Sequence, residues 1–345
     1  METQAPDTAG LYRRFARLEA RGSSPIYEAL CLAIAESAPT LAVLASLPRH
    51  KRQPNLLLGA LRWFGAPVEE PTAALAFIAD RAEDLRCFML DHATQTNEVA
   101  RCAVMLPALA LVPGPVALLE LGASAGLCLL PDRWSYEWTR PDGSLVRLGS
   151  GGPDQVSVGA RVSGPAPLPT VMPDVVARLG LDANPIDAAA PDQQRWLECL
   201  IWPEHTERAE RLHAALAAAA ADPPPIRTGL FPADVPAAVD HLHERAPGAT
   251  VVVLHSAAVA YADADARAQL AAVLAVLDVR RLGLEGAQVT RDLGLAGVPD
   301  AGGRFVLSLD DRVLGTADPH GRDLDWSEAD GRHADLDRPR SWSHR

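Results

Sequence analysis

The turn at 122–126, Gly-Ala-Ser-Ala-Gly, carries the clearest chemical signal of the chain and follows the apolar run 116–121. With Glu120 it matches Glu-x-Gly-x-Ser-x-Gly, a pattern typical of loops that bind S-adenosylmethionine (SAM). Small side chains let a ligand approach the backbone, and a helix after the turn would present free N–H groups. The same residues match Gly-x-Ser-x-Gly, the nucleophile elbow of serine hydrolases, in which Ser124 would attack.

A SAM site also needs an acid after the next strand, which would bind the ribose hydroxyls. Asp182 follows a short apolar stretch and is the first candidate, with Glu137 as the second. Two departures stand against this interpretation. Ser124 occupies the central glycine position of the loop, and the run 226–231 lacks an acid, so that Asp234 is the nearest one. The expected cofactor-binding residues are Glu120, Gly122, Ala123, Ser124, Gly126 and Asp182.

A hydrolase would need a histidine to activate Ser124, an acid and an oxyanion hole. His255 and His320 both follow Ser124 along the chain. However, a nucleophile elbow normally comes after several strands, whereas the first 112 residues predict helices and contain no His-Gly-Gly-type oxyanion motif. We therefore favour the SAM-type loop, with a strand–helix turn that binds nothing as the plain alternative.

His255 follows the apolar run 251–254, where the carboxyl ends of parallel strands line ligand crevices. It is either a general base that deprotonates a methyl acceptor or a structural histidine. His320 is a weaker candidate for the same role. No Cys or His spacing predicts a metal site.

Three further polar groups are candidates for substrate binding. The residues 94–98 exceed what a helix cap requires, although an N-cap with a Glu98–Arg101 pair is the plain interpretation. The basic run 49–52 is either a solvated helix start or an anion site. The expected substrate-binding residues are Thr94, Gln95, Thr96, Asn97, Glu98, Arg101, His50, Arg52 and Tyr261.

The elements that would position these residues change type at Pro113-Gly114-Pro115. Before it, helical periodicity predicts helices at 10–21, 25–37, 54–64, 75–89 and 95–111. After it, strands alternate with helices at 193–219 and 262–278, which predicts a parallel sheet. The predicted strands are 116–121, 177–182, 225–228, 250–254, 280–285, 304–309 and 312–317, the last two antiparallel. Residues 133–170 predict an inserted hairpin, and a polar, frayed tail begins at about 321.

Composition bounds the function. The chain has 345 residues and a net charge of −12, which disfavours nucleic acid as a partner. Its five cysteines are scattered, and neither a signal peptide nor a membrane span is predicted, so we expect a cytoplasmic protein. Its expected partner is a small molecule, and its oligomeric state is open.

The chain resembles a bacterial family catalogued only as a domain of unknown function, DUF2332. The resemblance covers most of residues 10–320 and brings no established activity. Its second half looks like a class I SAM-dependent methyltransferase, which is an analogy of fold. The motifs that carry the resemblance are His50–Asn55, Thr94–Glu98 with Arg101, Leu119–Leu127, Gly180–Asp182 with Pro185, Trp196-Leu197, Trp202-Pro203 and Pro319–Gly321.

The expected architecture is therefore α/β, a Rossmann-like sheet of the class I methyltransferase type with an N-terminal all-helical domain. We expect the helical domain at 1–112, the sheet domain at 113–320 and the tail at 321–345. The leading function is SAM-dependent methyl transfer to a small molecule, with the 94–101 region and the helical domain capping the acceptor. The alternatives are a serine esterase that uses Ser124 and a non-catalytic protein for ligand binding or assembly.

Overall fold

The computed structural model describes residues 7–95, 97–149, 152 and 155–327. The chain forms two compact units, which are described separately. The first comprises Met1–Thr96 and Ala189–His213, and the second comprises Asn97–Ala188 and Ala214–Arg345. These limits differ from the composition boundary at 112, because the helix before Pro113 packs with the sheet and a later helical segment packs with the N-terminal helices.

The first unit is helical, as the periodicity predicts. Serine and aspartate side chains cap several of its helices, and proline opens others at the first turn, where its missing N–H costs nothing. The predicted helix 193–219 is two helices, because Pro203 interrupts it. The helices are α1 (Thr8–Phe15), a π-helical turn (Ala16–Ala20), α2 (Pro25–Glu36), α3 (Ala38–Ala45), α4 (Pro54–Trp63), α5 (Pro71–Asp80), α6 (Ala82–Asp91), α8 (Pro191–Cys199) and the start of α9 (Thr206–Ala221).

Aromatic side chains fill the core of this unit. Trp196 packs edge-on against Phe88 with ring centroids 5.2 Å apart, and Trp202 packs in the same way against Tyr27 at 5.8 Å. Both tryptophans are therefore packing residues. In the described part of the chain no single helix meets the length and apolarity needed to cross a membrane, while the bent pair α2–α3 passes that test by composition and length only.

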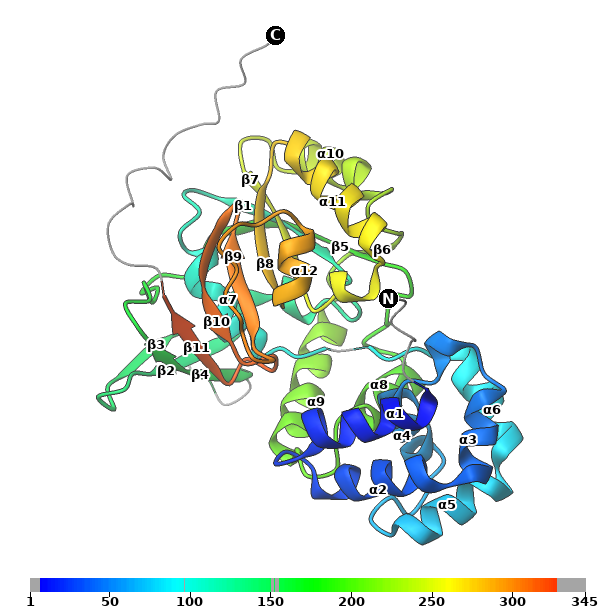
Figure 1. Cartoon of the computed structure of the whole chain (residues 1–345). Helices are drawn as coiled ribbons and strands as arrows, with labels where there is room; N and C mark the ends of the chain where they lie inside the picture. The colour runs from blue at the N-terminus through cyan, green and yellow to red at the C-terminus, as the bar shows by residue number, and fades with distance from the viewer. Residues whose placement is uncertain (1–6, 96, 150–151, 153–154, 328–345) are drawn as a thin grey trace. The chain divides into compact units, whose positions relative to one another are not determined.

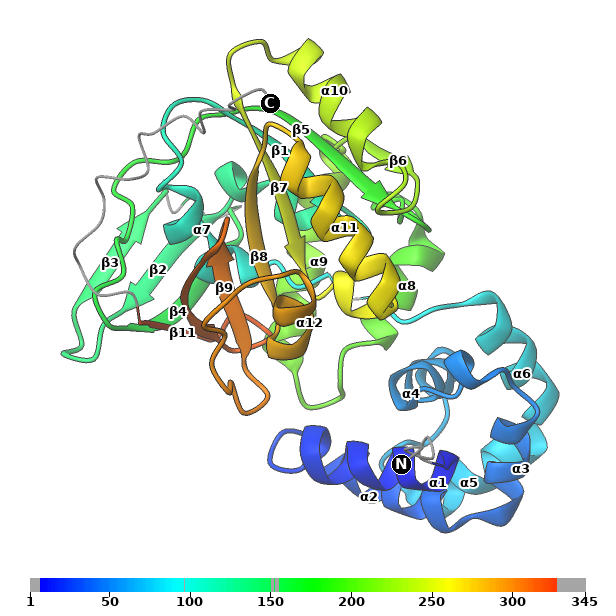
Figure 2. The same cartoon turned by 45° about the horizontal axis from the view of Figure 1, so that its top comes forward.

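The second unit contains an eleven-stranded mixed sheet (Figures 1 and 2). Its strand order is β3-β2-β4-β11-β10-β9-β8-β7-β1-β5-β6. The strands are β1 (Val116–Leu121), β2 (Ser135–Thr139), β3 (Leu145–Leu148), β4 (Ser157–Ser163), β5 (Val175–Asp182), β6 (Ile226–Thr228), β7 (Thr250–Ser256), β8 (Arg280–Gly286), β9 (Phe305–Leu309), β10 (Arg312–Ala317) and β11 (Asp323–Trp326). All seven predicted strands are present, close to their predicted limits.

The part β6-β5-β1-β7-β8 is entirely parallel, and β9 runs antiparallel beside β8. One face of it packs on α10 (Val235–Arg245), α11 (Ala264–Val276) and α12 (Ala287–Asp292), which Figure 2 shows in front of the strands. The opposite face packs on α7 (Arg101–Leu109), whose apolar side chains lie against Leu118, Leu254 and Leu282. The fold is thus α/β with helices on both faces of a mostly parallel sheet.

The predicted insertion is more than a hairpin. β2 and β3 pair across the turn at 140–143, as predicted, but β4 continues the insertion and pairs in parallel with β11. The prediction of a frayed tail from 321 is wrong for 321–327, because β11 lies between β10 and β4. The rest of that predicted tail lies outside the described residues. The alternation Asp-Leu-Asp-Trp is the shortest run that indicates a half-buried strand, and it stands among charged and polar residues.

Candidate functional site

The turn after β1 lies at the point where the sheet connections reverse direction. From β1 the order runs to β5 and β6 on one side and to β7 and β8 on the other. In open α/β sheets, ligands bind outside the carboxyl ends of the strands at such a point. The helix expected directly after the turn is absent: only the 3-10 turns Leu127–Leu129 and Pro131–Arg133 follow. No helix therefore begins directly at this turn.

Protein acceptors take every amide of the turn. The N–H groups of Gly122 and Ala123 donate to the carbonyl of Leu181, and that of Gly126 donates to the carbonyl of Ala123. The Ser124 amide donates to Oδ2 of Asp182 over 2.7 Å, and the Ala125 amide donates to Oδ1 of Asn97 over 3.0 Å. The turn is therefore a rigid, internally satisfied loop, not an open anion cradle.

Asp182 and Asn97 both accept hydrogen bonds from the backbone of this loop. Asp182, at the end of β5, also accepts from the amide of Asn184 over 2.7 Å, so each of its oxygens has one donor. The Asn97 amide group donates to the hydroxyl of Ser124. Asn97 therefore supports the loop, and its expected contact with substrate stays a prediction.

Close packing explains the glycines of the turn. A Cβ on Gly122 would lie 2.5 Å from the Cβ of Ala258, and one on Gly126 would lie 2.6 Å from Cγ of Pro224. Both residues also have a φ of +71°, which a side chain disfavours. The motif glycines are thus required by the protein itself, whether or not a ligand approaches them.

Glu120 is the buried acid of the site. Its side chain is 5 % exposed and lies on the α7 face of β1, in register with Leu254 of β7. Among the described residues, its Oε2 atom has no hydrogen-bond partner. Burial raises the pKa of this carboxyl well above its ordinary value, and the nearby Cys128 and Asp182 add to the rise, while Arg101 opposes it.

The raised pKa of Glu120 predicts a pH-dependent stability. The protonated carboxyl stabilises the fold fully below the unfolded-state pKa of about 4.5, and this contribution is lost as pH rises through the higher folded-state pKa. The glutamine in Glu120→Gln stays neutral at every pH. As pH rises from 4.5, the free energy of unfolding of this variant should therefore increase relative to that of the wild type. Urea denaturation at pH 4.5 to 8 measures this difference. A difference that does not vary with pH would contradict the buried, strained carboxylate.

His255 lies on the other face of the sheet. It is in register with Leu121 of β1 and Gly283 of β8, both on the side covered by α10 to α12. Its ring is 2 % exposed, and Nδ1 is 3.2 Å from Oε1 of Glu285. The same Oε1 accepts the amides of Ala258 and Val259 over 3.1 Å each. These contacts fit the structural role, although Nε2 has no partner among the described residues, and the role of general base stays a prediction.

The geometry does not assemble a serine hydrolase triad. Ser124 contacts Asn97 and Asp182 on the β5 side of β1, whereas the His255 ring lies toward β8. The ring of His255 lies directly against Gly283, because a Cβ on that glycine would be only 2.8 Å from Cε1 of the ring. The histidine therefore faces away from the candidate nucleophile.

Backbone strain is concentrated at the same edge. Ser124, after β1, has a φ of 50°, and Ala257, after the neighbouring β7, has a φ of 54°. Such a conformation costs non-glycine residues about 1 to 3 kcal/mol and persists where the surroundings fix it, often at functional sites. Here the contacts of Asp182 and Glu285 with the two loops supply that fixation.

Arg101 links the start of α7 to two loops. It is 4 % exposed and donates from Nη1 to the carbonyl of Ser256 over 3.1 Å, and from Nε to the carbonyl of Pro319 over 2.8 Å. The loop 318–322 is itself held by Asp318, which accepts from the amide of His320 and from Arg322. Arg101 and the half-buried His320 therefore lie beside the carboxyl edge, while their expected roles in substrate binding and catalysis stay predictions.

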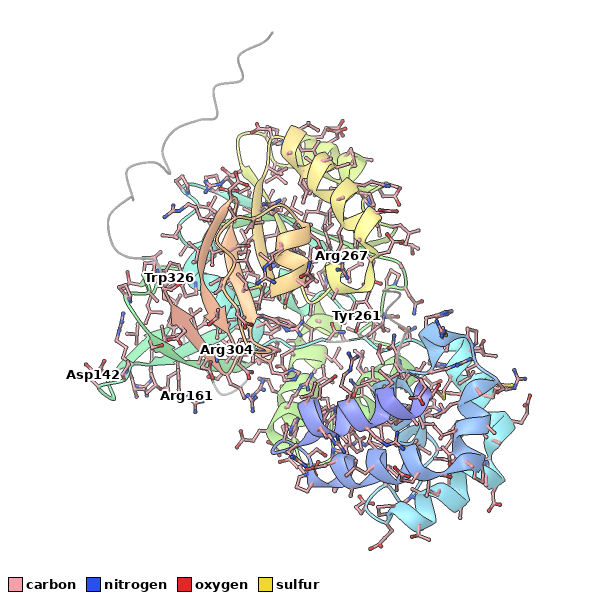
Figure 3. All side chains as sticks on the ribbon, in the orientation of Figure 1. Asp142, Arg161, Tyr261, Arg267, Arg304 and Trp326 are labelled. Carbon is pink, nitrogen blue, oxygen red and sulfur yellow. The ribbon has the colours of Figure 1, made fainter. Side chains whose placement is uncertain are left out.

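The remaining predicted residues have local roles or separate positions. Glu98 is buried and accepts from the amide of Ala100, but α7 begins only at Arg101 and has neither a side-chain N-cap nor an acid in its first turn, so the expected cap is not formed. Tyr261 follows β7 and is 62 % exposed, and Figure 3 labels it beside Arg267. Asp234 accepts from the amide of Leu230 at the start of α10. Glu137 pairs with Arg147 on β2–β3, at the far edge of the sheet from β5.

In the first unit, the polar group and the basic run make ordinary structural contacts. Thr94 donates to Oε1 of Gln53, and Gln95 follows it, while Thr96 lies outside the described residues. Arg52 donates to the carbonyls of Leu47 and Ala45 at the end of α3. His50 is exposed. These contacts favour the solvated helix start over an anion site for the basic run.

Glu285 was not predicted from the sequence, although its position at the end of a strand is a recognisable signal. An acid at the carboxyl end of a strand marked Asp182, and Glu285 stands at the equivalent place on β8. No group of three or more potential metal ligands exists among the residues that the structure describes.

The family model described as "Uncharacterized protein conserved in bacteria (DUF2332)" matches residues 9–326. No curated protein and no solved structure matches the chain.

Proposed function

The chain belongs to the DUF2332 family, whose description assigns no activity, and we propose from the site alone that it binds SAM and methylates a small molecule. The observation that carries the proposal is the pair of carboxylates Glu120 and Asp182. They stand at the ends of adjacent parallel strands, on either side of the strained turn at the reversal point. Asp182 contributes to the raised pKa of Glu120, and a cation bound beside the two carboxyl groups would lower that pKa and favour the ionised form of Glu120.

The charges of SAM suit this pair. SAM carries a sulfonium and an ammonium group, and the unpartnered Oε2 of Glu120 would accept from a cation or an N–H donor. Asp182 is half-buried, and each carboxylate oxygen has a second lone pair that a ribose hydroxyl can use. Because the loop amides are already paired, the carboxylate of SAM needs another donor. The guanidinium of Arg101, which acts on Glu120 electrostatically, is the candidate for that role.

The chain's own part in the reaction would be binding and positioning. Bound SAM would supply an electrophilic methyl group. The rigid loop at 122–126 would fix the ligand, and the loop 318–322 would bring polar groups to the acceptor. His255 lies on the face of the sheet opposite Glu120, so we do not place it beside the acceptor. His320 is half-buried at the edge, so it replaces His255 as the residue proposed to accept a proton.

Calorimetric titration of the full chain with SAM and with its demethylated product tests the proposal. We expect wild-type binding and a loss of about tenfold or more in Glu120→Gln, since a charge-assisted contact contributes about 1.5–3 kcal/mol. Glu137→Gln is the matched control, because this carboxylate pairs with Arg147 at the far edge of the sheet. Absence of heat at millimolar SAM, or equal affinity in both variants, would refute the proposal.

The serine esterase alternative has its own test. A fluorophosphonate probe labels activated serines, and we expect no labelling of Ser124, whose hydroxyl contacts Asn97 rather than a histidine. Labelling that disappears in Ser124→Ala would instead establish a hydrolase.

A further inference from the structure

A hollow of about 530 Å³ opens on strands that the proposed function does not use. It lies between the end of β2 with its turn, the end of β4 and the start of β11. Three arginines line it, one each from the β2–β3 turn, β4 and the residue before β9: Arg140, Arg161 and Arg304. Figure 3 labels Arg161 and Arg304 at this end of the sheet.

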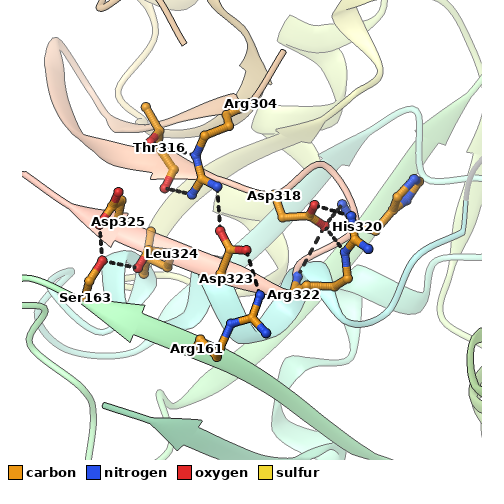
Figure 4. A network of polar contacts seen from close by, with 10 residues as sticks. All are labelled: Arg161, Ser163, Arg304, Thr316, Asp318, His320, Arg322, Asp323, Leu324 and Asp325. Carbon is orange, nitrogen blue, oxygen red and sulfur yellow. Dashed lines mark hydrogen bonds and ion pairs between the residues drawn. The ribbon is translucent and has the colours of Figure 1, made fainter. Parts of the chain in front are cut away.

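One of the three arginines is fixed by the protein. Arg304 donates from Nε to the hydroxyl of Thr316 over 3.1 Å and from Nη2 to the Thr316 carbonyl over 3.1 Å. Its Nη1 lies 2.6 Å from Oδ1 of Asp323 (Figure 4). The serine hydroxyl of Ser163 bonds to Asp325 on the opposite wall. These contacts form the hollow in advance of any ligand.

The other two arginines keep most of their donors. Arg161 makes one contact, 3.4 Å long, with Oδ2 of Asp323, and its side chain is 75 % exposed. Arg140 donates to the carbonyl of Ala166 over 3.5 Å and, within the described part of the chain, forms no ion pair. Three guanidinium groups face two carboxylates, Asp323 and Asp325, so the hollow carries positive charge in a protein whose net charge is −12.

We propose that this hollow binds a small anionic molecule, through a phosphate or carboxylate group held by Arg140 and Arg161. The planar guanidinium donates two parallel hydrogen bonds to either group, and two such side chains can hold one anion between them. Arg304 supports the site because it also pairs with Asp323, so that the single charge of this carboxylate is shared and does not fully neutralise Arg161.

The hollow is separate from the site at 122–126. Five strand spacings lie between β11 and β1, and at about 4.8 Å each they amount to about 24 Å. A small molecule in the hollow therefore does not reach the turn after β1. The proposal holds whether or not SAM binds there.

Titration of the full chain with inorganic phosphate and with malonate, followed by calorimetry, tests the site. We expect millimolar or tighter binding of at least one probe, reduced about fivefold or more in Arg161→Gln and in Arg140→Gln. Arg147→Gln is the matched control, because Arg147 is an exposed arginine of the same hairpin that pairs with Glu137 outside the hollow. Stronger binding of phosphate would identify a phosphorylated ligand, and stronger binding of malonate would identify a carboxylate.

Two outcomes would overturn the proposal. The first is that neither probe binds the wild type. The second is that all three arginine variants lose affinity equally, which would indicate general charge attraction. Because Arg161 is largely exposed, its truncation should leave the melting temperature unchanged, so a loss of binding reports on the site. Glu120→Gln should bind both probes as the wild type does, which separates this site from the proposed SAM site.

Discussion

Gly321→Ala should lower the free energy of unfolding by about 3 kcal/mol. Backbone strain contributes about 1 kcal/mol of this loss, and steric overlap of the new Cβ with the backbone of Ala100 contributes about 1–3 kcal/mol. A Cβ at this position would lie 2.3 Å from the carbonyl oxygen of Ala100, and the φ of Gly321 is +78°. The overlapping atom is backbone, so it cannot move aside as a flexible side chain would. Urea denaturation of the full chain measures the loss.

Gly143→Ala separates the two contributions. Gly143 has a similar φ, +80°, but nothing lies within 4 Å of its added Cβ. We expect a loss of about 1 kcal/mol from strain alone. Equal losses in the two variants would show that the loop 318–322 does not press against the start of α7. Since Arg101 follows Ala100, a real overlap should also displace the guanidinium from the carbonyl of Pro319.

Glu285→Ala should destabilise the protein by about 3–5 kcal/mol, because several buried donors would lose their acceptor at about 1–3 kcal/mol each. Its Oε1 accepts from His255 and from two amides of the loop 257–259, and its side chain is 1 % exposed. Alanine would leave the ring and both amides buried without an acceptor. Thermal and urea denaturation measure the effect.

Glu285→Gln is the informative comparison. A glutamine keeps one carbonyl oxygen where Oε1 lies, so the two amides retain their acceptor and most of the stability should remain. A glutamine variant as unstable as the alanine variant would mean that the charge, and not the acceptor geometry, holds the loop after β7.

The periodic elements could be predicted from the sequence. Continuous apolar runs such as 250–254 marked the buried parallel strands, and the prolines and serines marked the helix starts. The helix after the turn at 122–126 was predicted wrongly, because Leu127–Leu130 is apolar enough for a helix but Pro131 prevents its extension. Short strands such as β11 depend on partners distant in sequence, which local pattern does not reveal.

The candidate site was predictable only in part. Position at strand ends correctly brought Glu120 and Asp182 to adjacent strands. It could not tell which face of the sheet a side chain takes at the edge, because the register with neighbouring strands decides that. For this reason His255 was assigned to the same site as Glu120, although the two lie on opposite faces. Hydrogen bonds between loops, such as that from Asn97 to Ser124, have no signature in the sequence at all.

The position of β11 orders the assembly of the sheet during synthesis. The strands β2 to β4 emerge from the ribosome early, yet the strand that joins β4 to the rest of the sheet is the last of the eleven along the chain. Until residue 326 has emerged, one edge of β4 and one edge of β10 have no strand partner. Unpaired edges of this kind recruit other chains. The nascent protein is thus exposed to aggregation at these two edges until β11 has been made.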